Sequence, residues 1–160
     1  MRKIDQLLHE YGLSHQNPTN KLIHWICVPL IFFSIVGLVW SIPHQFLNDL
    51  VPIQPHQVVN WATMILLLVL IYYFILSIPL FFGMLIVAFA NIFVCYLLDV
   101  YVDIPLWLIS IVVFVLAWIG QFYGHNVEGK KPSFLKDVQF LLIGPAWLMH
   151  FIFKKLGLRY

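Results

Sequence analysis

No lysine or arginine occurs between residues 22 and 129, and apolar side chains dominate this stretch. Apolar residues make up 62% of the chain, aromatic residues 17% and charged residues only 10%. A water-soluble domain carries about 25% charged residues, because its surface has to be solvated. A chain this poor in charge is expected to expose its surface to lipid, and we therefore predict an integral membrane protein.

The apolar residues fall into four runs that could cross a bilayer as helices. A membrane-spanning helix needs about 20 apolar residues, and somewhat shorter runs are tolerated where the bilayer thins. Residues 41–57 separate the first two runs and are rich in proline, which favours a loop in water. We take Pro79 as a break between the second and third spans, with one long kinked helix as the alternative. The predicted spans are residues 22–40, 58–77, 82–98 and 105–123.

The nine basic residues all lie outside the predicted spans, before residue 22 or after residue 129. Lysine and arginine are enriched in cytoplasmic loops, and an even number of spans places both termini on one side of the membrane. We therefore predict a multi-pass protein with both termini cytoplasmic, in a bacterial inner membrane or the endoplasmic reticulum membrane. Residues 1–160 are expected to form a single membrane-embedded, all-α helix bundle. Because the basic residues are not interleaved with aromatic residues, we predict no nucleic-acid binding.

Two segments outside the spans are expected to lie at the cytoplasmic surface of the membrane. Residues 3–13 carry apolar residues at helical spacing, which predicts a short amphipathic helix that ends near Gly12. Residues 133–156 are interrupted by charged residues and by Gly144-Pro145. This pattern predicts two interfacial helices instead of a fifth span, with the second beginning at Pro145. A lid over a site at this surface is one role for them.

Three of the seven histidines are brought to one membrane depth by this topology. His15 and His24 lie at the start of the first span, and His125 lies at the end of the fourth. An ionisable side chain at that depth needs a partner and usually faces a polar cavity inside the bundle. The other four histidines are expected to be solvated or interfacial: His9, His44, His56 and His150.

Imidazole nitrogen is a ligand for iron, zinc, copper and nickel, and three histidines leave coordination positions open for substrate or oxygen. His15, His24 and His125 at one membrane depth therefore predict a metal site or a proton-transfer site. The alternative is three separate interfacial histidines. A ligating histidine also needs its second nitrogen held by a hydrogen bond, which the amides of Gln121 or Asn17 could provide. Asn20 is a further polar residue of the same predicted cavity.

Glu128 follows His125 by three residues and can share a helix face with it. It is a candidate ligand or base, or it only neutralises Lys130 and Lys131. The fourth ligand of the predicted site stays open between Glu128, His150 and water.

The start of the first span sets a geometric condition on this site. Either Asn17, with Pro18 as the first helical residue, or Asn20 can cap the helix. If Asn17 is the cap, His24 lies about 10 Å along the helix from it, at 1.5 Å per residue. For His15 and His24 to share an ion, the chain before Asn17 must fold back over the start of the helix.

Two histidine motifs give the chain a family resemblance. They are His15-x-Asn17-Pro18-x-Asn20-x-x-Ile23-His24 with Pro29, and Gln121-Phe122-x-Gly124-His125 with Glu128 and Pro132. In this order and separation they resemble those of the membrane 2-hydroxy-fatty-acid dioxygenases, a family that includes the fungal iron-dependent enzyme of phytosphingosine breakdown. The resemblance covers nearly the whole chain, from about Tyr11 to Gly157.

The resemblance implies an Fe(2+)-dependent enzyme that uses O2 to shorten a 2-hydroxy long-chain fatty acid by one carbon. The acyl chain would lie among the apolar spans, in contact with membrane lipids; the resemblance leaves the oligomeric state open. The expected metal ligands are His15, His24 and His125. The polar residues expected in the catalytic site are Glu128, Gln121, Asn17 and Asn20.

The alternative from another class is a non-enzymatic small membrane protein, either a transporter or a structural helix bundle. A transporter would place polar residues or broken helices near the bilayer midplane. Here the midplane is almost wholly apolar, with Asn91 and Pro79 as exceptions. Asn91 is interpreted as the source of a hydrogen bond between helices.

Overall fold

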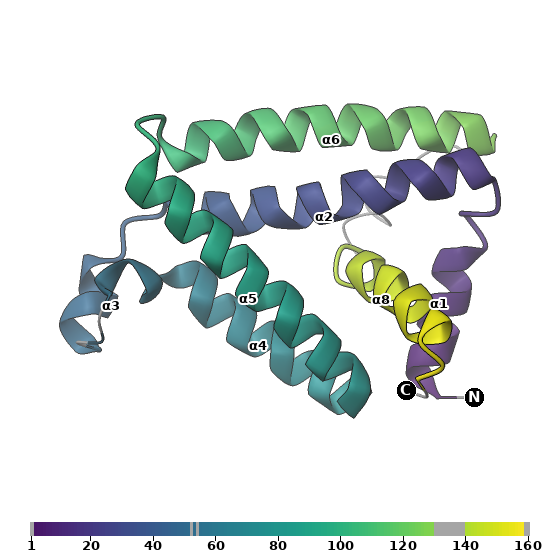
Figure 1. Ribbon diagram of the computed structural model, residues 1–160, viewed down its shortest axis with the longest axis horizontal. Helices are drawn as coiled ribbons and strands as arrows, with labels where there is room; N and C mark the ends of the chain where they lie inside the picture. The colour runs from purple at the N-terminus through teal and green to yellow at the C-terminus, as the bar shows by residue number, and fades with distance from the viewer. Residues whose placement is uncertain (1, 52, 54, 130–139, 159–160) are drawn as a thin grey trace.

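The computed structural model describes residues 2–51, 53, 55–129 and 140–158. Within these residues the regular structure is helical and no strand occurs, which confirms the all-α prediction (Figure 1). The helices are α1 (Lys3–Gly12), α2 (Pro18–Trp40), α3 (Gln45–Leu50), the 3-10 helix η1 (His56–Val58), α4 (Trp61–Leu76), α5 (Ile78–Tyr101), α6 (Leu106–Glu128) and α8 (Ile143–Lys155).

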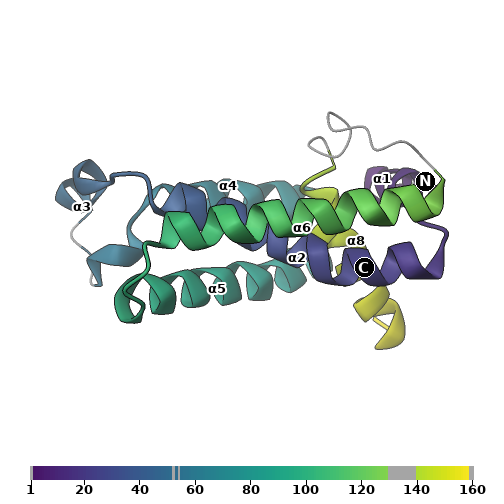
Figure 2. The same cartoon turned by 90° about the horizontal axis from the view of Figure 1, so that it is seen from above.

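The most extensive contact joins α2 and α6, which run antiparallel side by side along most of their length (Figures 1 and 2). Small residues let the two backbones approach closely. A Cβ added to Gly120 would lie 2.6 Å from Sγ of Cys27, and one added to Gly37 would collide with Oγ of Ser110. Close packing through small residues is characteristic of helices in membranes. The pair therefore brings the start of α2 against the end of α6.

Helices α4 and α5 form a second antiparallel pair, which crosses the first obliquely (Figure 1). Ser77 is extended between them, with φ −169° and ψ 123°, so the alternative of one long kinked helix is wrong. Pro79 lies in the first turn of α5, where a missing N–H costs no helical hydrogen bond. The predicted spans 58–77 and 82–98 therefore have the wrong bounds. Helix α4 begins at Trp61, after the cap Asn60, and α5 already begins at Ile78 because Pro79 fits into its first turn.

Within the described residues, three helices are long and apolar enough to cross a membrane: α2, α5 and α6. The 16 residues of α4 are apolar but fewer. At 1.5 Å per residue they extend about 24 Å, less than the ~30 Å hydrocarbon core. The outer faces of these helices carry large exposed apolar side chains, including Leu68, Ile75, Ile86 and Leu116. This surface is compatible with lipid, and the structure supports three candidate spans, not clearly four.

The terminal helices α1 and α8 pack against each other beside the start of α2 (Figure 1). Ile4, Leu8 and Tyr11 share one face of α1 and are buried, as the predicted amphipathic pattern requires. In α8, the residues from Ile143 to Leu148 are buried, so this helix packs into the bundle and does not only lie at a surface.

Two further expectations differ from the structure, and a third lies largely outside the described residues. Helix α8 begins at Ile143, two residues before the predicted start at Pro145, because proline is tolerated throughout the first helical turn. The first of the two expected C-terminal helices falls largely on residues 130–139, outside the described residues. The loop 41–57 contains the short helix α3, which the proline-rich composition did not reveal.

Candidate metal centre

The three histidines predicted to share a site come together at one end of the α2–α6 pair. His15 lies in the turn between α1 and α2, His24 in the second turn of α2 and His125 in the last turn of α6. Their exposed fractions are 3%, 1% and 5%. One ring nitrogen from each lies within 4.8 Å of the others, close enough for all three to serve a single ion.

The geometric condition on His15 is met, because the chain before Asn17 folds back over the start of α2. The ring centroids of His15 and His24 are 4.1 Å apart, and each ring lies 5.5 Å or less from that of His125. The ring of Tyr11 stacks on His15 at 4.2 Å, and Trp147 of α8 lies 5.3 Å from it. Aromatic packing therefore fixes His15, which is the one member of the three-histidine cluster that belongs to no helix.

Backbone carbonyl groups determine which nitrogen of two rings faces the centre. Nδ1 of His15 lies 2.6 Å from the carbonyl oxygen of Tyr11, and Nδ1 of His24 lies 2.9 Å from that of Asn20. A carbonyl oxygen only accepts, so each Nδ1 carries the proton and donates it. In the neutral rings the lone pair is then on Nε2. Metal-binding histidines are usually held in this way through their other nitrogen.

The three amide residues predicted to line the site, Asn17, Asn20 and Gln121, have different contacts in the structure. The side-chain oxygen of Asn17 accepts from the backbone amides of Thr19 and Asn20, so Asn17 caps α2 and does not hold an imidazole. Asn20 is fully buried and donates to the carbonyl oxygen of Ser14 and to Glu128. Gln121 is buried beside His24. Backbone carbonyls thus hold the second nitrogens of His15 and His24, a role predicted for Gln121 or Asn17.

Glu128 connects the end of α6 to the turn that carries His15. Its two carboxylate oxygens accept hydrogen bonds from the backbone amides of Gln16 (2.8 Å) and Asn17 (2.9 Å) and from Nδ2 of Asn20 (3.0 Å). Hydrogen bonds to a charged acceptor are stronger than those between neutral groups. The arrangement fixes the distance between His15 and His125. The alternative partners Lys130 and Lys131 lie outside the described residues.

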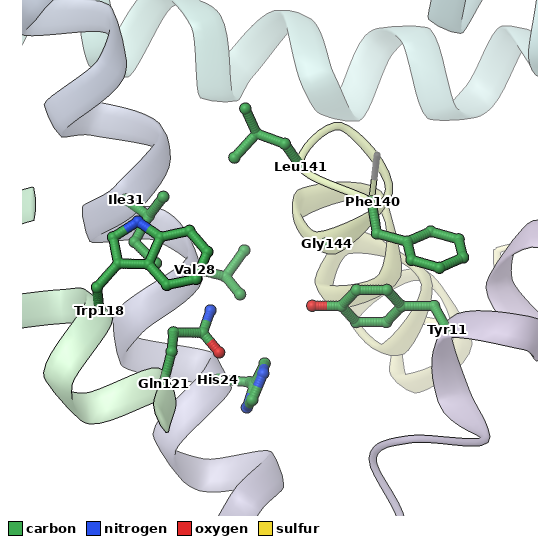
Figure 3. Close-up of a pocket in the computed structure, with 9 residues that line it drawn as sticks. All are labelled: Tyr11, His24, Val28, Ile31, Trp118, Gln121, Phe140, Leu141 and Gly144. Carbon is green, nitrogen blue, oxygen red and sulfur yellow. The ribbon is translucent and has the colours of Figure 1, made fainter. Parts of the chain in front are cut away.

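A small cavity of about 30 Å³ adjoins the centre. Figure 3 shows His24 and Gln121 on one side of it and Tyr11 on the other, with the tyrosine hydroxyl directed toward the cavity. Val28, Ile31, Trp118, Phe140, Leu141 and Gly144 complete the lining. A space of this size holds a water molecule or another small molecule, but not an acyl chain.

Sequence reasoning gave no role to three residues that shape this site: Tyr11, Trp147 and Gly144. A Cβ added to Gly144 would lie 3.1 Å from Val28 and 3.2 Å from the hydroxyl of Tyr11, so this glycine keeps the cavity open. One feature of the sequence could have identified Tyr11: it continues the apolar face of α1. That face was interpreted as membrane contact, whereas it packs against His15 and α8.

The remaining polar residues lie apart from the centre. His9 is exposed, and His150 is partly buried beside Phe151. Burial and the nearby Lys154 lower the pKa of His150, and Asp5 opposes this effect. Asn91 donates to the carbonyl oxygen of Val87 in its own helix, instead of to another helix as predicted.

Comparisons with known proteins identify the family of the chain. A family model described as "2-hydroxy-palmitic acid dioxygenase Mpo1-like" matches residues 1–156. A relative in Saccharomyces cerevisiae, 2-hydroxy-palmitic acid dioxygenase MPO1, is 30% identical over 149 residues, which are 92% of this chain and 78% of the yeast protein. No solved structure matches the chain.

Proposed function

The chain belongs to the Mpo1-like family, and on this basis we propose that it is an iron-dependent dioxygenase that shortens 2-hydroxy fatty acids by one carbon. The observation that carries the proposal is the buried cluster of His15, His24 and His125. Interfacial histidines that only reach toward water would not be buried in this way. The buried cluster therefore favours a functional site over a purely structural helix bundle.

The donor set fits a first-row metal ion. Three neutral imidazoles coordinate such an ion and leave other positions open, as a site that binds both substrate and oxygen requires. Zinc also binds histidine, but it has no redox chemistry and cannot pass electrons to dioxygen. We therefore propose that His15, His24 and His125 would hold Fe(2+), to which the carboxylate and hydroxyl of the 2-hydroxy acid could bind and which would supply the redox chemistry that O2 requires.

The proposed reaction needs no external reductant. One 2-hydroxy acid and one dioxygen give the acid one carbon shorter, carbon dioxide and water. The bond between C1 and C2 breaks, C2 is oxidised from an alcohol to a carboxylic acid, and C1 leaves as carbon dioxide. The substrate supplies all the electrons that reduce dioxygen, so the chain has to bind, orient and enclose the reactants.

In this proposal the residues around the centre hold it and exclude water. Tyr11 and Asn20 keep the Nε2 atoms of His15 and His24 directed at the ion through their carbonyl groups. Glu128 is a positioning residue, because its carboxylate already accepts three hydrogen bonds from the turn and from Asn20. Gln121 is the predicted polar residue that both lines the small cavity and adjoins His24.

We further propose that α2, α4, α5 and α6 cross the membrane with both termini cytoplasmic. The nine basic residues, all outside residues 22–129, support this orientation. The centre lies at the start of α2 and the end of α6, so it would face the cytoplasmic leaflet. A fatty acid in that leaflet could then present its carboxylate to the centre while its tail stays in lipid.

The test is reconstitution of the purified protein. Metal-depleted protein is supplied with Fe(2+) or Zn(2+) in the presence of O2 and 2-hydroxypalmitic acid, and the fatty acid products are measured. The proposal expects the acid one carbon shorter with Fe(2+) only. No shortened acid with either metal contradicts the dioxygenase function, and equal turnover with both metals contradicts the iron dependence.

A further inference from the structure

A second cavity lies between α2 and α4, and all the side chains that line it are apolar. Its volume is about 120 Å³, compared with about 30 Å³ for the cavity beside His24. Its walls are α2 from Phe32 to Val39, α4 from Ala62 to Val69, and Leu141 with Leu142 just before α8. Because these side chains offer no hydrogen-bond partner, the cavity suits a hydrocarbon and not a polar ligand.

The two cavities meet at Leu141, which lines both of them. The hydroxyl of Tyr73, buried in α4, donates to the carbonyl oxygen of Leu142 and so fixes this segment of the backbone. The side chain of Leu141 itself is only partly buried. A rotation of this side chain, with its backbone held in place, would join the two cavities.

One face of α2 connects the histidine centre to the far end of the second cavity. Its lining residues recur every three or four positions and so share that face. From the first to the last of them the helix rises about 22 Å, at 1.5 Å per residue. They are His24, Val28, Ile31, Ile35 and Val39.

We propose that the cavity between α2 and α4 binds the acyl chain of the 2-hydroxy acid. The inference rests on the proposed function, which supplies the ligand. A substrate with its carboxylate and hydroxyl at the histidine centre must direct its tail away from it, and the small cavity cannot hold that tail. The tail passes Leu141 and follows α2 toward Val39. The far wall, formed by Val39 and Ala62, limits the chain length.

A photolabel locates the tail independently of turnover. The full-length protein in lipid nanodiscs, with and without Fe(2+), is irradiated with 2-hydroxypalmitic acid that carries a terminal diazirine. Labelled peptides are then identified by mass spectrometry. The proposal expects labels on the cavity walls, at residues 35–39 and 62–69, that excess unlabelled acid removes. Labels confined to outward residues such as Ile75 and Ile86 would overturn it, even if the acid is turned over.

Filling the far end of the cavity tests its selectivity. Ala62→Leu is expected to lower kcat/KM for 2-hydroxypalmitic acid roughly tenfold relative to 2-hydroxydodecanoic acid, since a misfit of a few methylenes in an apolar pocket has effects of this size. Ala90→Leu adds the same atoms on the exposed face of α5 and should leave the ratio unchanged.

The shorter acid also reports folding, because an intact centre still turns it over. Equal losses for both acids in Ala62→Leu, with an unchanged melting temperature, would overturn the proposal. If the wild-type protein shortens no acid at all, the proposed function fails, and the photolabel alone decides where a chain binds.

Discussion

The two antiparallel helix pairs of this molecule differ in what they bury. Among the described residues of these four helices, the buried histidine, asparagine, glutamine and serine side chains lie on α2 and α6. In α5 the polar Asn91 is partly buried, and the buried Asn60 lies just before α4 as its cap. Burying a polar group costs free energy unless the group is hydrogen-bonded. Buried polar groups are therefore expected mainly where they have a structural or chemical role. Under the proposed function, the α2–α6 pair carries the reaction and the contact between α2 and α4 selects the acyl chain.

The comparison also separates two ways in which buried polar groups are used. At the far end of α2, the indole of Trp40 donates to Asp99 at 3.2 Å, a contact that ties helices together. At the near end, one ring nitrogen from each of three histidines lies within 4.8 Å of the others. Convergence of several donor atoms, more than burial itself, is what marks the near end as a site.

The largest expected effect is the loss of a histidine of the centre. In His24→Ala and His125→Ala we expect turnover to fall at least about 100-fold, more than the loss usually caused by residues that only orient a ligand. Product formation from 2-hydroxypalmitic acid measures it. His150→Ala, on α8 and outside the centre, is the control and should retain activity within about twofold. Equal losses in all three variants would contradict a special role of the histidine centre.

Replacing Glu128 should have the next largest effect. Glu128→Ala removes three hydrogen bonds that hold the turn of His15, so we expect iron affinity to fall about 10- to 100-fold. Metal titration, with kcat measured at saturating iron, is the readout. A positioning role predicts that kcat largely recovers when iron is saturating. A collapse of kcat with unchanged iron affinity would instead identify Glu128 as a base.

Enlarging Gly124 tests the close approach of α2 and α6. A Cβ at this position would lie 2.5 Å from Oδ1 of Asn20, which the hydrogen bonds to Ser14 and Glu128 hold in place. Gly124→Ala is therefore expected to cost about 1–3 kcal/mol of stability. A Cβ at Gly12 would lie 3.5 Å from Nε1 of Trp147, an ordinary contact distance, so Gly12→Ala should cost less. Thermal unfolding compares the two variants, and a larger loss for Gly12→Ala would contradict a close approach of α2 and α6 at Gly124.

The smallest effect is expected for Tyr73→Phe. The change removes the hydrogen bond to Leu142, worth about 1 kcal/mol, and leaves the histidine centre untouched. Iron affinity should be unchanged, while a more mobile Leu141 should weaken discrimination between short and long acids. The kcat/KM ratios of the two acids provide the measurement, and a large loss of bound iron would show that this helix pair is not separate from the centre.

Much of the fold could be predicted because charge and periodicity are visible in the sequence. The position of the basic residues and the apolar runs predicted a helical bundle in which His15, His24 and His125 meet. The sequence left the cap of the first span open between Asn17 and Asn20, and the structure has Asn17 as the cap. The break near Pro79 was found, but its position was wrong by two residues, since a proline can either end a helix or begin one.

The other features of the site and of α8 could not be predicted, because they depend on contacts that the identity of the side chains does not reveal. The carbonyl groups of Tyr11 and Asn20 hold two histidines, and every residue has a carbonyl group. The partners of Glu128 include backbone amides that converge only after the turn has formed. An apolar helix facing protein also has the same composition as one facing lipid, so the burial of α8 could not be inferred.

The central claim is that His15, His24 and His125 hold one iron ion together. X-ray absorption spectroscopy at the iron edge of the reconstituted protein tests it most directly, because imidazole rings give characteristic multiple scattering. We expect one iron per chain in the wild-type protein, with three histidine ligands. In His15→Ala we expect the iron to have two histidine ligands. Iron bound without imidazole, or an unchanged spectrum in His15→Ala, would contradict it.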